Sequence, residues 1–148
     1  FETVLESDCA PLTDLVRVML EACPAIRSLR DPTRGGVSSA LNELSVASHV
    51  GVRLEESSIP IRPEVRGACE MLGLDPLYVA NEGKLVAVCA AADADRLLAA
   101  MRAHPLGRGA ASIGEAIEDR HHFVQMDTRF GGRRIVDWLA GEQLPRIC

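Results

Sequence analysis

Apolar residues recur at the three- and four-residue spacing of an α-helix in four stretches of the chain. These stretches cover about residues 11–22, 37–47, 65–72 and 94–101. Pro24 and Gly73 follow the first and third stretches, where residues that end a helix are expected, and Asp93 is predicted to cap the fourth. His104, which precedes a proline, is expected to end that fourth helix.

Strand-like segments separate the predicted helices. They cover residues 26–29, 49–54, 84–90, 112–117 and 122–125, and residues 133–139 predict a short strand or a turn of helix. The run from Lys84 to Ala90 is nearly continuously apolar and rich in valine, which predicts a buried central strand. A charged turn joins the segments 112–117 and 122–125. Because helices alternate with strands, we expect an α+β (layered α/β) fold in which one sheet is covered by helices.

Composition narrows the range of partners. The chain of 148 residues fits one domain, carries a formal net charge of −5, and contains one Trp, one Tyr and three Phe. Few aromatic residues and a negative charge argue against a nucleic-acid partner. The sequence has neither an apolar run long enough to span a membrane nor a signal-peptide pattern, so we expect a cytoplasmic protein. The start at Phe1, without a Met, is typical of a piece of a longer protein.

The cysteines and histidines predict no metal site. The five cysteines are an odd number without a C-x-x-C pair, which makes a poor disulfide framework and a poor zinc site. Cys69 lies on the apolar stripe of a predicted helix, Cys89 lies in an apolar strand and Cys23 lies at a helix end. All three are expected to behave as buried hydrophobic residues. His121 and His122 are adjacent, and neighbouring strand residues point to opposite faces, so a solvated turn is the expected setting.

The chain ends in a cysteine, Cys148, within the segment 142–148. Termini are the most mobile part of most domains, and an accessible thiolate is a nucleophile, so this tail is suited to act as a carrier arm. Pro145 favours extended backbone in the tail. We therefore expect a domain at 1–140 and a mobile tail at 141–148, with Phe130 and Trp138 packing near its root. The alternative is a passive, frayed terminus.

Asp31-Pro32-Thr33-Arg34-Gly35-Gly36 precedes the second predicted helix. Asp31 or Thr33 is predicted to cap that helix, and the two glycines let the backbone approach another surface closely. Free N–H groups at the helix start, with Arg34 beside them, would suit an anion such as phosphate. The alternative is a tight turn in which the glycines serve packing and Arg34 makes a surface ion pair.

Ala80-Asn81-Glu82-Gly83-Lys84 comes directly before the apolar run. A carboxylate in a turn at a strand edge, beside apolar surroundings, is a candidate general base, because desolvation can raise its pKa. Glu82 is that candidate. The alternative is an ordinary turn with Glu82 exposed to water.

Together, Asp31 to Gly36, Ala80 to Lys84 and the ending Pro145-Arg146-Ile147-Cys148 resemble the hydrogenase maturation factor HypE family. This family belongs to the superfamily of aminoimidazole-ribotide and selenophosphate synthetases. The resemblance implies a mixed β-sheet of about four or more strands packed with helices, like the C-terminal domain of aminoimidazole-ribotide synthetase. It also implies a missing N-terminal domain, which holds most of the ATP and Mg²⁺ site and much of the homodimer interface.

The resemblance implies a reaction in [NiFe]-hydrogenase maturation. The carbamoyltransferase HypF places a carbamoyl group on the Cys148 sulfur, and ATP-dependent dehydration converts it to a thiocyanate. The cyanide then passes to the hydrogenase iron through the HypC–HypD complex. A chain without the N-terminal domain is expected to hold no cofactor and to be inactive alone.

The resemblance also implies roles for individual residues. Glu82 matches the glutamate proposed to act as the base, and Pro145, Arg146 and Ile147 would position the tail. The residues that would face the nucleotide or the passing tail are Asp31, Thr33, Arg34, Gly35, Gly36 and Asn81. Two alternatives stay open: a non-catalytic carrier or interaction module, and another synthetase of the superfamily, which would not need Cys148.

Overall fold

The computed structural model describes residues 7–139 of the chain. The tail residues predicted to be functional, Pro145, Arg146, Ile147 and Cys148, lie outside the described residues. The division into a domain at 1–140 and a tail at 141–148 therefore stays a prediction. Within the described part, the helices are too short and too polar to cross a membrane.

The α-helices of residues 7–139 form where the apolar periodicity predicts them. They are α1 (Thr13–Ala22), α2 (Gly36–Ser48), α3 (Pro63–Leu72) and α4 (Ala91–Ala103). The strands lie in or next to the predicted segments: β1 (Ser28–Arg30), β2 (Gly51–Glu55), β3 (Val86–Val88), β4 (Gly114–Ile117), β5 (Val124–Asp127) and β6 (Arg133–Ile135). Short 3₁₀ helices, η1 (Glu56–Ser58), η2 (Pro76–Tyr78) and η3 (Pro105–Gly107), lie between them.

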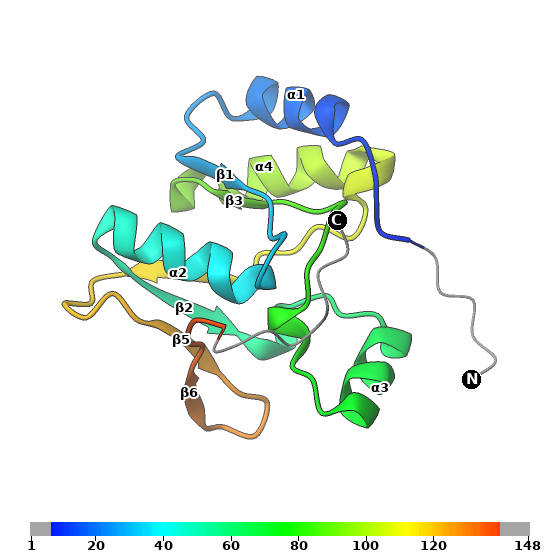
Figure 1. Ribbon diagram of the computed structural model, residues 1–148. Helices are drawn as coiled ribbons and strands as arrows, with labels where there is room; N and C mark the ends of the chain where they lie inside the picture. Colours follow the sequence, from blue (N-terminus) through cyan, green and yellow to red (C-terminus); the bar gives the residue numbers. More distant parts are fainter. Residues whose placement is uncertain (1–6, 140–148) are drawn as a thin grey trace.

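The strands of the described part form two sheets, so the expectation of one sheet is wrong. β1 and β3 pair as an antiparallel ribbon, and the larger, four-stranded sheet has the order β4-β2-β5-β6 (Figure 1). The larger sheet is mixed, because β2 and β5 are parallel and the other pairs are antiparallel. This confirms the predicted mixed sheet of an α+β fold. β2 lies between β4 and β5, so the two strands that flank the charged turn are not neighbours.

The apolar run that contains β3 is not a central strand. β3 pairs with β1 only, and its residues are partly buried. Val86 packs against the core beside α2, whereas Leu85, Ala87 and Cys89 pack against the core beside α1 and α4. The run is apolar because both faces of the β1–β3 ribbon are covered, although β3 has a single neighbouring strand in the described part.

Two hydrophobic clusters hold the layers together. The first lies between α1 and α4 and contains Leu15, Met19, Cys23 and Leu97. The second lies between α2 and the four-stranded sheet and contains Leu41, Leu54, Ile59, Leu77, Val124, Met126 and Val136. Burying each such large side chain contributes about 1.5–3 kcal/mol. Figure 1 shows α2 along the larger sheet, on the side toward the β1–β3 ribbon.

Cysteine burial follows the prediction for two residues. Cys23 and Cys69 are buried and Cys89 is partly buried. Burial raises the pKa of the Cys69 and Cys89 thiols, and nearby acidic groups raise it further. These two thiols are therefore poorly suited to act as nucleophiles at neutral pH.

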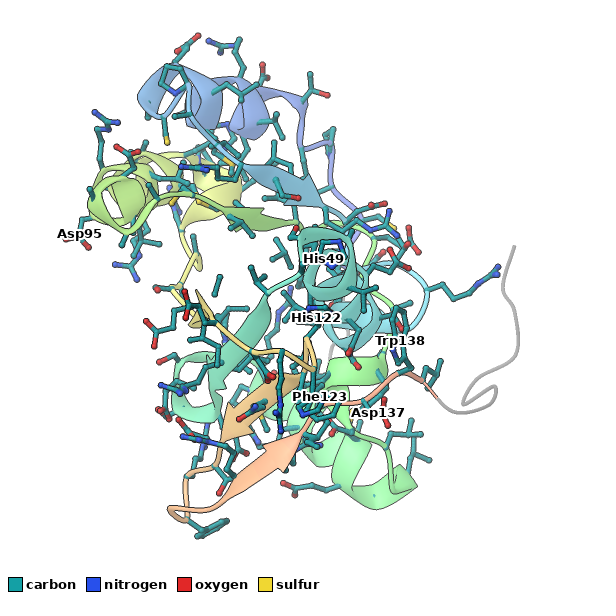
Figure 2. All side chains as sticks on the ribbon, turned by 90° about the vertical axis from the view of Figure 1, so that its left-hand side faces the viewer. His49, Asp95, His122, Phe123, Asp137 and Trp138 are labelled. Atoms are coloured by element: carbon teal, nitrogen blue, oxygen red, sulfur yellow. The ribbon has the colours of Figure 1, made fainter. Side chains whose placement is uncertain are left out.

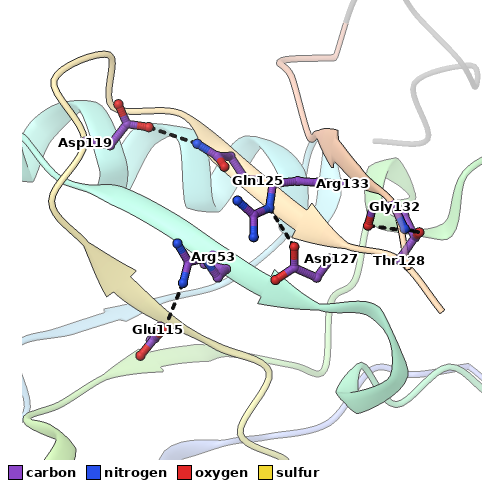
Figure 3. A network of polar contacts seen from close by, with 8 residues as sticks. All are labelled: Arg53, Glu115, Asp119, Gln125, Asp127, Thr128, Gly132 and Arg133. Atoms are coloured by element: carbon purple, nitrogen blue, oxygen red, sulfur yellow. Dashed lines mark hydrogen bonds and ion pairs between the residues drawn. The ribbon is translucent and has the colours of Figure 1, made fainter. Parts of the chain in front are cut away.

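The opposite face of the four-stranded sheet is polar (Figure 3). Arg133 donates to Asp127 over 2.6 Å across the β5–β6 pair, and Gln125 donates to Asp119 over 3.1 Å. Arg53 on β2 lies 3.7 Å from Glu115 on β4. The hydrogen bond and charge of Arg133 hold the pKa of Asp127 below its ordinary value, against a smaller opposing effect of burial.

Three local predictions are wrong. Asp93 lies inside the first turn of α4, whose N-cap is Ala90, and it pairs with Arg96 instead of capping the helix. Phe130 is fully exposed and Trp138 is 45% exposed, so neither packs as expected within the described part.

His104 does end α4, as predicted, and its ring nitrogen accepts a hydrogen bond from the Leu106 amide.

Candidate functional site

The two candidate loops, 31–36 and 80–84, lie against each other. The Asn81 amide donates to the Pro32 carbonyl over 3.0 Å. Gly36 has a φ of +62°, and a Cβ on it would lie 2.5 Å from the Leu77 carbonyl oxygen and 2.6 Å from that of Val79. Only glycine allows α2 to begin this close to η2. The fold therefore brings together two stretches that are far apart in the sequence.

The start of α2 differs from the predicted cap. Its N-cap is Gly35, in the left-handed region, and no side chain caps the helix, so neither Asp31 nor Thr33 has that role. The Thr33 carbonyl instead accepts a hydrogen bond from the Gly36 amide over 3.0 Å. The Gly36 amide is thus engaged, and a Cβ on Gly36 would meet two carbonyl oxygens, so this glycine allows the close packing of α2 against η2.

Arg34 is exposed at this turn. No carboxylate among residues 7–139 lies within ion-pair distance of it, so the surface pair of the packing alternative does not form there. Its guanidinium is thus accessible to an anion or to another segment of chain.

A cavity of about 310 Å³ opens beside the two loops, against α1 and β1. Its lining divides into an apolar part, made of Ala10, Leu12, Val16, Leu29 and Leu85, and a polar part, made of Arg30, Asp31, Glu82 and Lys84. The structure therefore places Asp31 and Glu82, both predicted site residues, at one cavity. Glu82 itself is exposed, so it combines apolar neighbours with contact to water.

The cations of this cavity already have partners. Arg30 lies 2.6 Å from Glu43 and 3.6 Å from Asp31, and Lys84 lies 3.0 Å from Asp8. Glu82 makes no ion pair with any residue of the described part. A carboxylate that is exposed and not neutralised is available to accept a proton from a group placed in the cavity.

Asp8 is the residue of this site that sequence analysis missed. Its carboxylate accepts hydrogen bonds from Lys84 and, over 3.3 Å, from the Glu82 amide. Burial raises the pKa of Asp8, but the Lys84 and Glu82 contacts outweigh burial and hold it below its ordinary value. In the sequence, Asp8 is only an acidic residue shortly before a helix. Such residues are too common for this position to predict a functional role.

Leu139, the last described residue, lies beside the same loops. Asn42 on α2 donates to the Val136 carbonyl over 2.9 Å, and Ser38 donates to the Asp137 carbonyl over 2.5 Å. Leu139 then lies 3.8 Å from the place that a Cβ on Gly35 would take. Figure 2 shows Asp137 and Trp138 on this segment, which follows β6. The last described residue is therefore at the N-terminal end of α2.

The histidines of the charged turn lie at a different place. The rings of His49 and His122 meet edge to face with centroids 5.2 Å apart (Figure 2), and His121 stacks on Phe123 at the same distance. Within residues 7–139 no group of three or more His, Cys, Asp or Glu side chains could hold a metal ion.

Comparison with known proteins gives the family. The model of the family described as AIR synthase related protein, C-terminal domain, matches residues 1–127. The chain belongs to this family. It is also 68% identical, over all of its 148 residues, to carbamoyl dehydratase HypE of Cupriavidus necator, and covers 42% of that protein. The resemblance to the C-terminal domain of HypE is confirmed.

Solved HypE structures have the same fold. The chain matches HypE in a HypE–HypF complex with a TM-score of 0.88 and 41% identity, over 93% of this chain and 45% of that one. It matches HypE in complex with ATP with a TM-score of 0.89 and 42% identity, over 96% of this chain and 44% of that one. The chain thus spans less than half the length of the relatives it matches.

Proposed function

We propose that this chain is the C-terminal domain of a HypE-type, ATP-dependent S-carbamoyl-cysteine dehydratase of [NiFe]-hydrogenase maturation. The observation that carries the proposal is the 68% identity to carbamoyl dehydratase HypE, because it extends over the whole chain, tail included. The position of residue 139 beside the loops of Arg34 and Glu82 supports it further.

The tail has the length that its role requires. An extended chain covers about 3.3–3.6 Å per residue, so residues 140–148 span up to roughly 30 Å. We propose that this length lets Cys148 reach both the loop of Glu82 and a partner protein. We propose that Pro145 keeps the tail extended and that Arg146 and Ile147 guide it, Arg146 by its charge and Ile147 by apolar contact.

The proposed reaction has two stages. The Cys148 thiolate takes a carbamoyl group from the carbamoyltransferase HypF and becomes a thiocarbamate. ATP supplies the phosphoryl group that makes the amide oxygen a leaving group. The nitrogen loses its first proton as its neighbouring oxygen is phosphorylated and ADP is released. Glu82 then removes the second proton, the carbon–nitrogen triple bond forms, and phosphate departs, leaving a thiocyanate on Cys148. The HypC–HypD complex would then receive the cyanide for the active-site iron.

The described residues do not fit a complete ATP or Mg²⁺ site. The cations of the cavity, Arg30 and Lys84, are engaged by carboxylates, and the Gly36 amide is used within its turn. We therefore place most of the nucleotide and metal site on the part of the longer protein that this chain does not cover. The family resemblance implies that much of the homodimer interface lies there too. Arg34 and the loop residues Asp31, Thr33, Gly35, Gly36 and Asn81 would contribute from the edge, facing the nucleotide or the tail.

The test measures how much active hydrogenase cells produce with each variant of the longer protein. We expect the protein to act in the cytoplasm. Cys148→Ala in the longer protein should abolish maturation, because the carrier atom is lost, while the thermal unfolding midpoint stays unchanged. Cys9→Ala is the control for the loss of a thiol, since Cys9 is exposed. Normal maturation by Cys148→Ala would sink the proposal and favour a plain interaction module.

A further inference from the structure

We propose that Asp8 is a positioning residue for the reaction, holding the loop of Glu82 in place; this inference rests on the proposed role of Glu82 as the base. The carboxylate of Asp8 accepts the Glu82 amide hydrogen at 3.3 Å and binds the Lys84 ammonium at 3.0 Å. It thus contacts the residues on both sides of Gly83. Two anchoring points on one loop fix its course more firmly than one.

Gly83 gives independent evidence that the segment around Asp8 is built against this loop. A Cβ on Gly83 would lie 1.6 Å from the Asp8 carbonyl oxygen and 2.8 Å from the Ala10 amide nitrogen. Gly83 has an ordinary backbone conformation, so glycine is required there by the close approach of the two backbones. Asp8 therefore binds the Glu82 loop through its side chain, and its backbone packs closely against Gly83.

The cavity connects this contact to the chemistry. Ala10 and Leu12, which follow Asp8, line the same cavity as Glu82 and Lys84. The Asp8 side chain is only 30% exposed, whereas the Lys84 side chain is 48% exposed. The Lys84 ammonium is held by Asp8 at 3.0 Å, and Glu82 has no ion-pair partner among residues 7–139.

The experiment compares single-turnover conversion of S-carbamoyl-Cys148 to thiocyanate in full-length variants, with ATP varied. Asp8→Ala should lower the rate constant about tenfold to a hundredfold, since small displacements of catalytic groups have effects of this size. The ATP concentration for half-maximal rate and the carbamoylation of Cys148 should not change. Asp8→Asn, which keeps an acceptor for the Glu82 amide, should retain part of the rate. Asp14→Ala is the control, because Asp14 is exposed on α1 and pairs only loosely with Arg17, at 3.8 Å.

The outcomes separate this inference from the proposed function. In a Glu82→Gln background, Asp8→Ala should lower the residual rate no further, which a merely structural role does not predict. A normal rate for Asp8→Ala, or equal losses of carbamoylation and dehydration with a lowered unfolding midpoint, would overturn the role of Asp8. A normal rate for Glu82→Gln would instead overturn the assignment of the base, whatever the Asp8 variants do.

Discussion

Two polar regions of this molecule differ in how their charges are balanced. On the outer face of the four-stranded sheet, Asp127 lies 2.6 Å from Arg133 and Glu115 lies 3.7 Å from Arg53 (Figure 3). Around the cavity, Lys84 and Arg30 are paired, but Glu82 and Arg34 have no ion-pair partner among the described residues. On the sheet face, Arg53, Glu115, Asp127 and Arg133 each have an oppositely charged neighbour. The loop region is left with one carboxylate and one guanidinium toward solvent.

The difference indicates which charges are structural. Paired charges across neighbouring strands stabilise the sheet modestly, by about 0.2–1 kcal/mol each. Unpaired charges contribute little to folding, and we propose that Glu82 and Arg34 meet a substrate or a partner. Changing the loop charges should therefore affect catalysis, and changing the sheet charges should affect stability.

The largest expected effect is that of Glu82→Gln in the full-length protein. Removing a general base lowers the rate of its step by about 10²–10⁴-fold, so thiocyanate formation should nearly stop. Carbamoylation of Cys148 should continue, because it precedes the proton removal. Quantifying the two modified forms of the C-terminal peptide over time checks this. Accumulation of thiocyanate at the usual rate would show that the unpaired carboxylate is not the base.

A second prediction concerns the packing that brings the loops together. Gly36→Ala should destabilise the protein by at least about 2 kcal/mol, because a left-handed residue with a Cβ is strained and this Cβ would meet two carbonyl oxygens. Gly73→Ala is the matched control: it has a similar φ of +68° at a helix end, but nothing lies within 4 Å of its Cβ position. Urea unfolding should show a clearly smaller loss for Gly73→Ala. Equal losses would mean that strain alone, without the contact to η2, explains Gly36.

A third prediction concerns the start of the tail. Asn42 is buried and donates to the Ser38 and Val136 carbonyls, each over 2.9 Å. Asn42→Ala leaves a buried carbonyl without its donor, which should cost about 1–3 kcal/mol of unfolding free energy. It should also increase amide hydrogen exchange in residues 136–139. Unchanged exchange there would indicate that α2 does not fix this segment.

The smallest expected effects are those of the paired and unpaired arginines. Arg34→Met should leave the unfolding free energy almost unchanged, whereas Arg133→Met should lower it slightly at neutral pH. Because the pKa of Asp127 lies below its ordinary value of 3.8, the contribution of its pair is present above that value and is lost as pH falls through the lowered pKa. The stability difference between wild type and Arg133→Met should therefore shrink in acid. A larger loss of unfolding free energy for Arg34→Met than for Arg133→Met would contradict the structural role of the sheet charges.

The sequence predicts local features of this fold better than long-range ones. Apolar periodicity predicts all four helices of the described part, because each helix buries one stripe of its own residues. The arrangement of sheets is not predictable in the same way: the strands are three to five residues long, and the run around Val86 is apolar because two layers cover it. Glu82 could be proposed from its motif, but its contact with Asp8 joins residues 74 positions apart. Nothing local encodes such a pair.

The most direct test of the account is mass spectrometry of the C-terminal peptide. The chain would be incubated with the carbamoyltransferase, carbamoyl phosphate and ATP, with and without the full-length protein. We predict that Cys148 gains a carbamoyl group and that thiocyanate forms only where the nucleotide-binding part is supplied. A Cys148 that stays unmodified under every condition would contradict the carrier role of the tail.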